Sequence, residues 1–290
     1  MKFDKNTKIL IVGLGLIGGS YAKALSDNGY FVGAIDKKKS SVEYALKNGL
    51  IQVGETSVKK DFVKDFDLIV FALYPHDFIN WIKEYQSSIK SGALITDVTG
   101  VKSFVVENVQ KILRGDLEFV GAHPMAGKEV SGVENADSKI FVGANYIVTP
   151  TKKNTDENVQ AVKDLGRALG FERISSLSPE EHDETVGFLS HLTHCIAVSL
   201  MVSKKSHHLA EYTGDSFRDL TRIAKINDEM WSELFLANKD ELLKQMDLFE
   251  EKFNQLKEDI KNDNREKIRE TLRESTARRK VFDKDAKETK

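Results

Sequence analysis

Short apolar runs and helix-spaced apolar residues alternate along the first part of this 290-residue chain. Apolar runs bounded by turn residues predict buried strands, whereas apolar residues at three- and four-residue spacing predict helices. Glycines follow most of the predicted helices, where a left-handed residue ends a helix. The pattern predicts strands at residues 8–13, 31–36, 67–73, 93–98, 117–122 and 145–149, and helices at residues 16–28, 40–48, 76–90, 102–114 and 155–169.

This alternation is typical of a parallel sheet with helices on both faces. Right-handed crossovers then place a ligand crevice at the carboxyl ends of the strands. The pattern changes after a last predicted strand at residues 171–177, where Ser178 and Pro179 begin a helix and no further strand signal follows. We therefore predict an α/β fold: a doubly wound parallel-sheet domain at residues 1–178, followed by an all-α domain at residues 179–290.

The long helix predicted at residues 180–205 is apolar on most of its sides. A helix that is apolar all round is buried, and a domain of about 110 residues offers little interior to bury it. We therefore expect a homodimer, in which the helical domain of a second chain covers part of this helix. Further helices are predicted near residues 215–225, 228–236, 238–261 and 264–280.

The first predicted strand breaks into Gly13-x-Gly15-x-x-Gly18, and a helix follows at once. A strand, a glycine turn and a helix are the context that a dinucleotide-binding fingerprint requires. The first glycine allows the turn, the second lets a pyrophosphate approach the backbone, and the third lets the helix pack on the strand. The helix N-terminus, at Leu16 and Ile17, offers N–H groups to the phosphates. These features predict a Rossmann-type domain, and a glycine-rich turn in another α/β domain is the alternative.

The second predicted strand ends in Asp36, about 20 residues past the glycines, where the acid that binds the adenosine ribose is expected. A carboxylate accepts hydrogen bonds from ribose hydroxyls and repels a 2′-phosphate, so Asp36 favours NAD over NADP. Three lysines at residues 37–39 could soften that repulsion, although a solvated loop is the simpler explanation for them. Leu73, at the end of a predicted strand, is a further expected contact of NAD.

Composition and charge argue against several classes of protein. A net charge of −2 and an apolar content of 40% are ordinary for a globular protein and give no sign of a nucleic-acid or anionic-membrane partner. The one cysteine, Cys195, excludes an intrachain disulfide and fits a reducing compartment. We find no apolar run near the ~20 residues that span a bilayer, and the chain enters its first strand without room for a signal peptide. We therefore expect a cytoplasmic protein.

His123 and Thr99 are candidates for chemistry on the predicted sheet. His123 ends an apolar strand and precedes a proline, which favours an extended conformation, so we expect it to point from the sheet edge toward the nicotinamide. Imidazole can take a proton from a substrate hydroxyl while hydride leaves the same carbon. A structural histidine that caps a loop is the alternative. Thr99 could contact nicotinamide or substrate, or could only cap the next helix.

The helical half carries three histidines and an arginine of interest. His191 and His194 share one helix face, whereas His182, nine residues before His191, would face the opposite way on a continuous helix. The pair lacks an evident third metal ligand, so no metal is predicted. Instead the two histidines either satisfy each other in the core or line the active crevice. Arg222 lies among apolar residues, and a buried guanidinium requires an anion, either Asp219 or a substrate carboxylate.

Together these features resemble the prephenate/arogenate dehydrogenase family of tyrosine biosynthesis, and the resemblance covers nearly the whole chain. The motifs that carry it are Gly-Leu-Gly-Leu-Ile-Gly-Gly-Ser (13–20), Thr-Asp-Val-x-Gly-Val-Lys (96–102), His-Pro-Met-Ala-Gly-x-Glu-x-Ser-Gly (123–132), Ser-His-Leu-x-His (190–194) and Asp-Leu-Thr-Arg-Ile-Ala (219–224), with Trp231.

The resemblance implies oxidative decarboxylation of prephenate. Hydride would pass from the hydroxyl-bearing ring carbon to NAD, carbon dioxide would leave, and 4-hydroxyphenylpyruvate would form. The resemblance also implies that His123 accepts the hydroxyl proton, that Arg222 binds a carboxylate of prephenate, and that His194 lies near substrate and nicotinamide. Further implied substrate contacts are Glu129, His191 and Trp231.

Gly100 departs from the family pattern. Many relatives have a serine at this position, and its hydroxyl touches the catalytic histidine and the substrate. Gly100 offers no hydroxyl, so Thr99 or a water molecule would have to replace it.

Three alternative functions stay open. An arogenate dehydrogenase would use the same chemistry, and Glu129 could pair with the amine of arogenate. A non-catalytic NAD-binding sensor would need neither a base nor an anion clamp, so His123 and Arg222 argue against it. A β-hydroxyacid dehydrogenase would carry Lys-x-x-x-Asn at the start of the long helix, and residues 180–205 do not contain that motif.

Overall fold

The computed structural model describes residues 1–205 and 208–282. It divides into two compact units, Met1–Lys239 and Asp240–Lys290. The predicted helical domain extends to residue 290, and its end at residues 283–290 lies outside the described residues. The predicted boundary at residue 178 stays a prediction.

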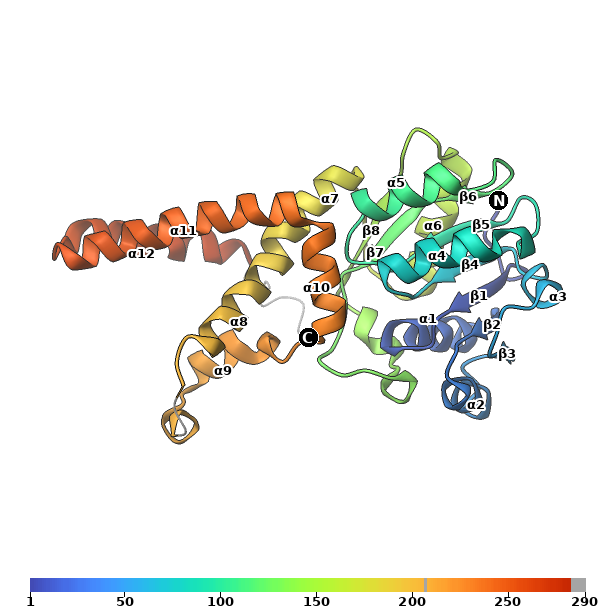
Figure 1. Ribbon diagram of the computed structural model, residues 1–290, viewed down its shortest axis with the longest axis horizontal. Coiled ribbons are helices and arrows are strands. Elements are labelled where there is room, and N and C mark those ends of the chain that lie inside the picture. Colours follow the sequence, from blue (N-terminus) through green and yellow to red (C-terminus); the bar gives the residue numbers. More distant parts are fainter. Residues whose placement is uncertain (206–207, 283–290) are drawn as a thin grey trace. The chain divides into compact units, whose positions relative to one another are not determined.

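Six parallel strands form the main sheet in the order β3-β2-β1-β4-β5-β6 (Figure 1). The strand order changes direction between β1 and β4, and doubly wound sheets bind ligands beside such a switch point. The α/β fold with a parallel sheet is thereby confirmed. The strands are β1 (Lys8–Val12), β2 (Phe31–Ile35), β3 (Val53–Glu55), β4 (Leu68–Phe71), β5 (Leu94–Asp97) and β6 (Glu118–Phe119). The short β3 was not predicted, because its three residues contain only one apolar side chain.

Helices cover both faces of this sheet. Successive side chains of a strand point to opposite faces, so Ile9 and Ile11 enter one hydrophobic core, whereas Leu10 and Val12 enter the other. The helices of this part are α1 (Leu16–Asp27), α2 (Lys39–Lys47), α3 (Lys60–Val63), α4 (Pro75–Tyr85), η1 (Gln86–Ser88), α5 (Ser103–Ile112), η2 (Val133–Asn135), η3 (Ser138–Phe141) and α6 (Asp156–Ala168).

Three strands form a separate sheet, which corrects the prediction that they continue the main one. They are β7 (Gly121–Pro124), β8 (Asn145–Thr149) and β9 (Arg173–Ser176), in the order β7-β8-β9, with β7 and β8 antiparallel. The strand predicted at residues 117–122 is split: the N–H of Val120 still binds the main sheet at Ile95, whereas the next residue pairs with β8. A strand buried on both faces shows the same apolar run in either sheet. Periodicity therefore could not assign these strands to the main sheet or to the smaller one.

The rest of the first unit is helical. A continuous run consists of α7 (Pro179–Val186), the π-helix η4 (Gly187–Leu192) and α8 (Thr193–Val202). Ser178 begins it with a capping box, in which Ser178 and Glu181 each accept the other's backbone N–H. After the run come η5 (Leu209–Tyr212), α9 (Asp215–Thr221), η6 (Arg222–Ala224) and α10 (Asp228–Ala237). No strand follows β9 in the described residues, as predicted for an all-α part.

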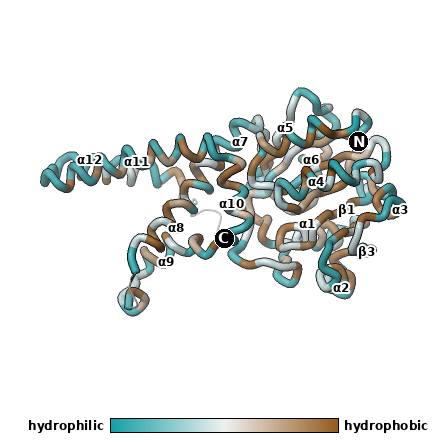
Figure 2. The backbone as a smooth tube through the Cα atoms, in the orientation of Figure 1, coloured by the Kyte–Doolittle hydropathy of each residue, from teal (hydrophilic) through white to brown (hydrophobic). Residues whose placement is uncertain are grey.

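The run from Pro179 to Val202 is long and apolar enough, by length and composition, to cross a membrane. The expectation that no apolar run approaches that length was therefore wrong. A few polar residues interrupt the run but hardly lower the mean hydropathy of a long apolar helix. Figure 2 shows hydrophobic residues along α8 and mostly hydrophilic ones at α7. The run also carries buried polar side chains at His182, Asp183 and His191.

The second unit consists of helices α11 (Lys239–Lys261), α12 (Arg265–Arg279) and the short η7 (Lys280–Phe282). Asp263, in the turn between α11 and α12, adopts a positive φ of 53°. Apolar residues recur along one side of α11 at three- and four-residue spacing and are substantially exposed. They include Met246, Phe249, Phe253 and Ile260.

Candidate active site

The glycine turn joins β1 to α1 at the switch point of the sheet. Gly13 has a φ of 98°, and a Cβ there would clash with the carbonyl oxygen of Ala72. A Cβ on Gly18 would clash with the backbone of Gly13, whereas a Cβ on Gly15 would meet nothing within 4 Å. The first and third glycines are thus needed for packing, and the second leaves space for a ligand. This division matches the one expected of a dinucleotide-binding turn.

Asp36 lies directly after β2 and beside this turn. Its Oδ2 accepts the N–H of Leu14 at 2.6 Å, and its Oδ1 accepts the N–H of Lys38 at 2.7 Å. These backbone donors hold the carboxylate where a ribose would lie next to the glycines. The contact with Leu14 links the acid to the turn itself.

The N-terminus of α1 completes the cofactor side of the site. The helix begins at Leu16 without a capping side chain and without an acid in its first turn. The N–H groups of its first turn, including those of Leu16 and Ile17, can therefore serve a phosphate. Leu73 follows β4 and lies against the turn, since a Cβ on Gly13 would come within 3.0 Å of its Cδ2. The chain thus offers a phosphate cradle, a ribose acceptor and an apolar wall, which fit a dinucleotide.

His123 lies on β7 of the smaller sheet rather than at the end of a main-sheet strand, which corrects its predicted position. β7 passes the carboxyl end of β5, because the N–H of Ala122 binds Oδ1 of Asp97 at 3.0 Å. His123 therefore still lies near the carboxyl edge of the main sheet. Burial is the main cause that lowers the pKa of His123 well below 6.5, and repulsion from the nearby Lys102, and from His182 and His191 whenever they are protonated, adds to it. The imidazole is neutral at neutral pH and able to accept a proton.

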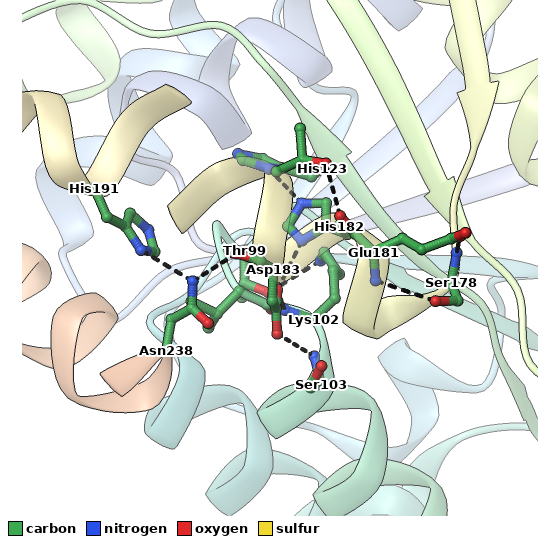
Figure 3. A network of polar contacts seen from close by, with 12 residues as sticks. Thr99, Lys102, Ser103, His123, Ser178, Glu181, His182, Asp183, His191 and Asn238 are labelled. Atoms are coloured by element: carbon green, nitrogen blue, oxygen red, sulfur yellow. Dashed lines mark hydrogen bonds and ion pairs between the residues drawn. The ribbon is translucent and has the colours of Figure 1, made fainter. Parts of the chain in front are cut away.

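His123 is the first member of a chain of polar contacts (Figure 3). Its Nδ1 lies 2.9 Å from Nε2 of His182, whose Nδ1 lies 2.8 Å from Oδ1 of Asp183. Asp183 also accepts the backbone N–H groups of Lys102 and Ser103 at 2.7 Å each. Burial alone would raise the pKa of Asp183, but its hydrogen bonds with His182 and these backbone donors lower it. Asp183 is therefore a buried carboxylate ion.

Asn238 connects His191 to the same network (Figure 3). Its Nδ2 donates to the carbonyl oxygen of Asp183 at 2.9 Å and lies 3.2 Å from Nδ1 of His191. Because a carbonyl can only accept, the amide presents its NH₂ group here, and Nδ1 of His191 must accept. Burial lowers the pKa of His191 to about 4. The neutral ring therefore carries its hydrogen on Nε2 and can donate it.

The network also links His182 with His191, which we had placed on opposite faces of one helix. The side-chain carboxylate of Asp183 contacts His182, and its backbone carbonyl oxygen accepts from the Asn238 amide, which in turn contacts His191. The segment between the two histidines includes the π-helix η4. A π-helix turns less per residue than an α-helix, and such segments occur often at functional sites.

A buried ion pair lies next to the histidine network, which the backbone N–H of Lys102 joins at Asp183. Nζ of Lys102 lies 2.6 Å from Oδ2 of Asp97, and both side chains are fully buried. The hydroxyl of Thr99 contacts Asp97 and the carbonyl oxygen of Val101, and accepts from Lys102 at 3.0 Å. Thr99 thus belongs to this ion-pair cluster. Its role as a substrate or nicotinamide contact stays a prediction.

Position 100 borders Nε2 of His123. A Cβ built on Gly100 would lie 3.8 Å from Nε2 of His123 and 3.5 Å from the side chain of Leu234. A hydroxyl at this position would therefore lie next to the imidazole, whereas glycine leaves that space open. The hydroxyl of Thr99 is held by the ion pair, and which group takes the place of a serine hydroxyl at position 100 stays a prediction.

Trp231 on α10 joins the two other histidines. The rings of His194 and Trp231 lie 3.7 Å apart between centroids, at 30°, and His191 meets the same indole edge-on at 6.0 Å. Nδ1 of His194 donates to the carbonyl oxygen of Ser190 at 2.8 Å, which leaves Nε2 as an acceptor. Burial also lowers the pKa of His194. His194, predicted as a catalytic residue, is thus brought together with two predicted substrate contacts, His191 and Trp231.

Arg222 differs from its predicted environment. Its side chain is 63% exposed and forms an ion pair with Glu129, not with Asp219. The expectation of a buried guanidinium was therefore wrong. The helix predicted at residues 215–225 ends early, and the chain continues as the short η6 with neighbours such as Leu220 also exposed. The ion pair does bring together two residues predicted to bind substrate.

Sequence reasoning did not place Asp183 and Asn238 in the site. Asp183 could have been noticed as an acid beside His182 near the start of a largely apolar helix. Asn238 lies between α10 and α11 with no local motif to mark it. Among the residues that the structure describes, no group of three or more His, Cys, Asp or Glu side chains could hold a metal ion.

Two family models match the chain. The model described as the prephenate dehydrogenase nucleotide-binding domain matches residues 21–173, and the one described as the prephenate dehydrogenase dimerization domain matches residues 178–274. Together they cover most of the chain.

Curated relatives and solved structures agree with these matches. The prephenate dehydrogenase of Bacillus subtilis is 35% identical over 249 residues, which cover 82% of this chain and 66% of the relative. That of Lactococcus lactis subsp. cremoris is 32% identical over 257 residues, or 86% and 70%. The chain thus spans about two thirds of the length of these relatives.

A crystal structure of prephenate dehydrogenase from A. aeolicus, in complex with hydroxyphenyl propionate and NAD⁺, has a TM-score of 0.87 to this chain. The two are 34% identical, and the match covers 96% of this chain and 98% of the other. With the glycine turn, the acid after β2 and the histidine network already described, these matches show that the chain belongs to the prephenate dehydrogenase family.

Proposed function

We propose that this chain is an NAD-dependent prephenate dehydrogenase, which converts prephenate to 4-hydroxyphenylpyruvate and carbon dioxide. The observation that carries the proposal is the neutral His123 near the carboxyl edge of a sheet whose glycine turn and Asp36 fit NAD. Family membership supports the same substrate class.

NAD, when bound, supplies the hydride acceptor. The glycine turn and Asp36 hold it, while Nε2 of His123 takes the proton from the substrate hydroxyl as the carbon–hydrogen bond gives up its hydride. The bond to the ring carboxylate then breaks, carbon dioxide leaves, and its electron pair completes the aromatic ring. Arg222 binds a carboxylate of the substrate, and Trp231 with His191 and His194 forms the wall beside it.

A single assay tests this proposal. The purified chain is given prephenate or arogenate, each with NAD or NADP, and the appearance of reduced cofactor is followed. We expect the highest kcat/KM with prephenate and NAD. Absence of turnover in all four combinations would contradict the enzymatic assignment and leave only a nucleotide-binding protein.

Arogenate dehydrogenase is the second candidate, and the half-exposed Glu129 favours it. This carboxylate lies at the end of the Arg222 side chain, where it could pair with the amine of arogenate. The matched variant is Glu129→Gln. If arogenate is the substrate, this change should raise KM for arogenate more than KM for prephenate.

We also propose that the chain forms a homodimer through its helical part, residues 179–290, with NAD bound by residues 1–178. The description of the matching dimerization domain supports this, as do apolar side chains exposed along η4 and α8: Phe188, Leu189, Met201 and Val202. A homodimer interface would also account for the apolar run of this helix without a membrane. Light scattering should give twice the chain mass, and Met201→Glu should shift it toward the mass of one chain.

The cytoplasm is the proposed compartment. A biosynthetic dehydrogenase needs soluble NAD and substrate, and the one cysteine, Cys195, is consistent with a reducing environment. Fractionation of the native cells would test it.

A further inference from the structure

We propose that His182 and Asp183 are positioning residues for His123: they hold its imidazole in the form with a bare Nε2 and offset the positive charge that it acquires. This inference rests on the proposed function, in which His123 is the base. It assigns a task to two residues that are buried away from the surface.

The argument begins with Asp183, which can only accept hydrogen bonds when ionised. Its two oxygens accept the backbone N–H groups of Lys102 and Ser103, and Oδ1 also lies 2.8 Å from Nδ1 of His182. Nδ1 of His182 must therefore carry a hydrogen. A neutral imidazole has only one N–H, so Nε2 of His182 is an acceptor.

The same logic fixes the next ring. Nδ1 of His123 lies 2.9 Å from Nε2 of His182. Because Nε2 of His182 accepts, Nδ1 of His123 must donate, and Nε2 of His123 is left with a lone pair. That nitrogen borders Gly100, on the side of the ring away from the relay. Asp183 thus selects, through two hydrogen bonds, the tautomer that a general base requires.

The charges around the relay indicate a second task. Lys102, directly before α5, disfavours a positive His123, as would His182 and His191 from the long helix if they were protonated. Asp97 on β5 is already paired with Lys102. Asp183 is therefore the carboxylate that the hydrogen-bond chain connects to His123. When Nε2 accepts the substrate proton, both N–H bonds of the relay stay in place, and the imidazolium lies one ring away from a carboxylate ion.

A purely structural role is the competing explanation, since Asp183 also caps the start of α5. Two variants of His182 separate the explanations. In His182→Gln the amide oxygen can still accept from Nδ1 of His123, but the connection to Asp183 is lost. In His182→Leu the acceptor is lost as well. His208→Gln is the matched control, because His208 is exposed and pairs only locally with Glu211.

We expect His182→Gln to lower kcat by about one to two orders of magnitude and His182→Leu to lower it further, since positioned bases contribute about 10²- to 10⁴-fold. KM for prephenate and the Kd for NAD should change by less than about threefold, because the His182 side chain is fully buried and presents no surface to either ligand. Losing the connection to the Asp183 carboxylate should also move the acid limb of the kcat/KM profile to lower pH, because protonated His123 is then stabilised less. His208→Gln should match the parent.

Two results would overturn the proposal. One is an unchanged kcat and an unchanged acid limb in a folded His182→Gln protein, checked by its melting temperature. The other comes from the parent protein itself: ¹⁵N NMR at neutral pH should show the hydrogen of His123 on Nδ1, and a hydrogen on Nε2 would contradict the argument whatever the variants do. If the parent turns over neither prephenate nor arogenate, the proposed function fails instead.

Discussion

At the scale of single residues, desolvation decides which histidines can act as bases. His123, His182, His191 and His194 all have pKa values lowered chiefly by burial. They are therefore neutral at neutral pH, and hydrogen bonds to fixed acceptors and donors determine which nitrogen of each ring is free. Residue type alone could not have supplied this information.

His123→Asn should abolish turnover and leave the Kd for NAD within about threefold, since the general base is lost while the glycine turn and Asp36 are untouched. Steady-state kinetics and isothermal titration with NAD measure the two effects separately. A large loss of NAD affinity with the rate constant preserved would contradict the assignment of His123 as the base.

Arg222→Ala should raise KM for prephenate by about an order of magnitude, because a charge-assisted hydrogen bond is worth roughly 1.5–3 kcal/mol. Arg222→Lys keeps the charge but cannot hold a carboxylate through two parallel N–H groups, so we expect an intermediate KM. An unchanged KM in both variants would mean that the guanidinium serves only its exposed ion pair with Glu129.

At the scale of elements, the glycine turn shows how backbone packing and ligand space share one short segment. Gly13 and Gly18 pack against backbone, whereas Gly15 faces open space. Gly13→Ala should therefore lower the free energy of unfolding by about 1–3 kcal/mol, from its positive φ and its contact with Ala72. Chemical denaturation measures it.

Gly29→Ala is the matched control for that prediction. Gly29 also has a positive φ, of 77°, but a Cβ there would meet nothing within 4 Å. Gly29→Ala should lower the free energy of unfolding by the backbone strain alone, about 1 kcal/mol. Equal losses in the two variants would show that the close approach of Ala72 adds nothing.

At the scale of the whole molecule, the buried histidines make stability depend on pH. In the unfolded chain these histidines bind protons below pH about 6.5, whereas in the folded protein the same histidines stay neutral until lower pH. The free energy of unfolding should therefore fall as pH drops below 6.5, by up to about 1.4 kcal/mol per pH unit for each such histidine. Urea denaturation at several pH values checks the sign, and a flat profile down to pH about 5 would contradict it.

Periodicity and local chemistry determined much of this protein without coordinates. The apolar run of β1, the glycines and Asp36 lie within 30 residues of one another along the chain, so the nucleotide-binding element is a local property of the sequence. The alternation of strands and helices likewise predicted the main sheet, and Ser178 marked the start of the long helix because capping depends on neighbouring residues.

Only the tertiary structure decided the rest, because it depends on contacts between distant segments. The transfer of β7 and β8 into a second sheet, the exposure of Arg222 and the relay from His123 through His182 to Asp183 all arise where separate elements meet. An apolar run has the same sequence pattern whichever sheet buries it. A histidine in the sequence likewise does not show which of its ring nitrogens is free. Contacts between distant residues determine both the sheet and the tautomer, and the local sequence does not specify which residues make those contacts.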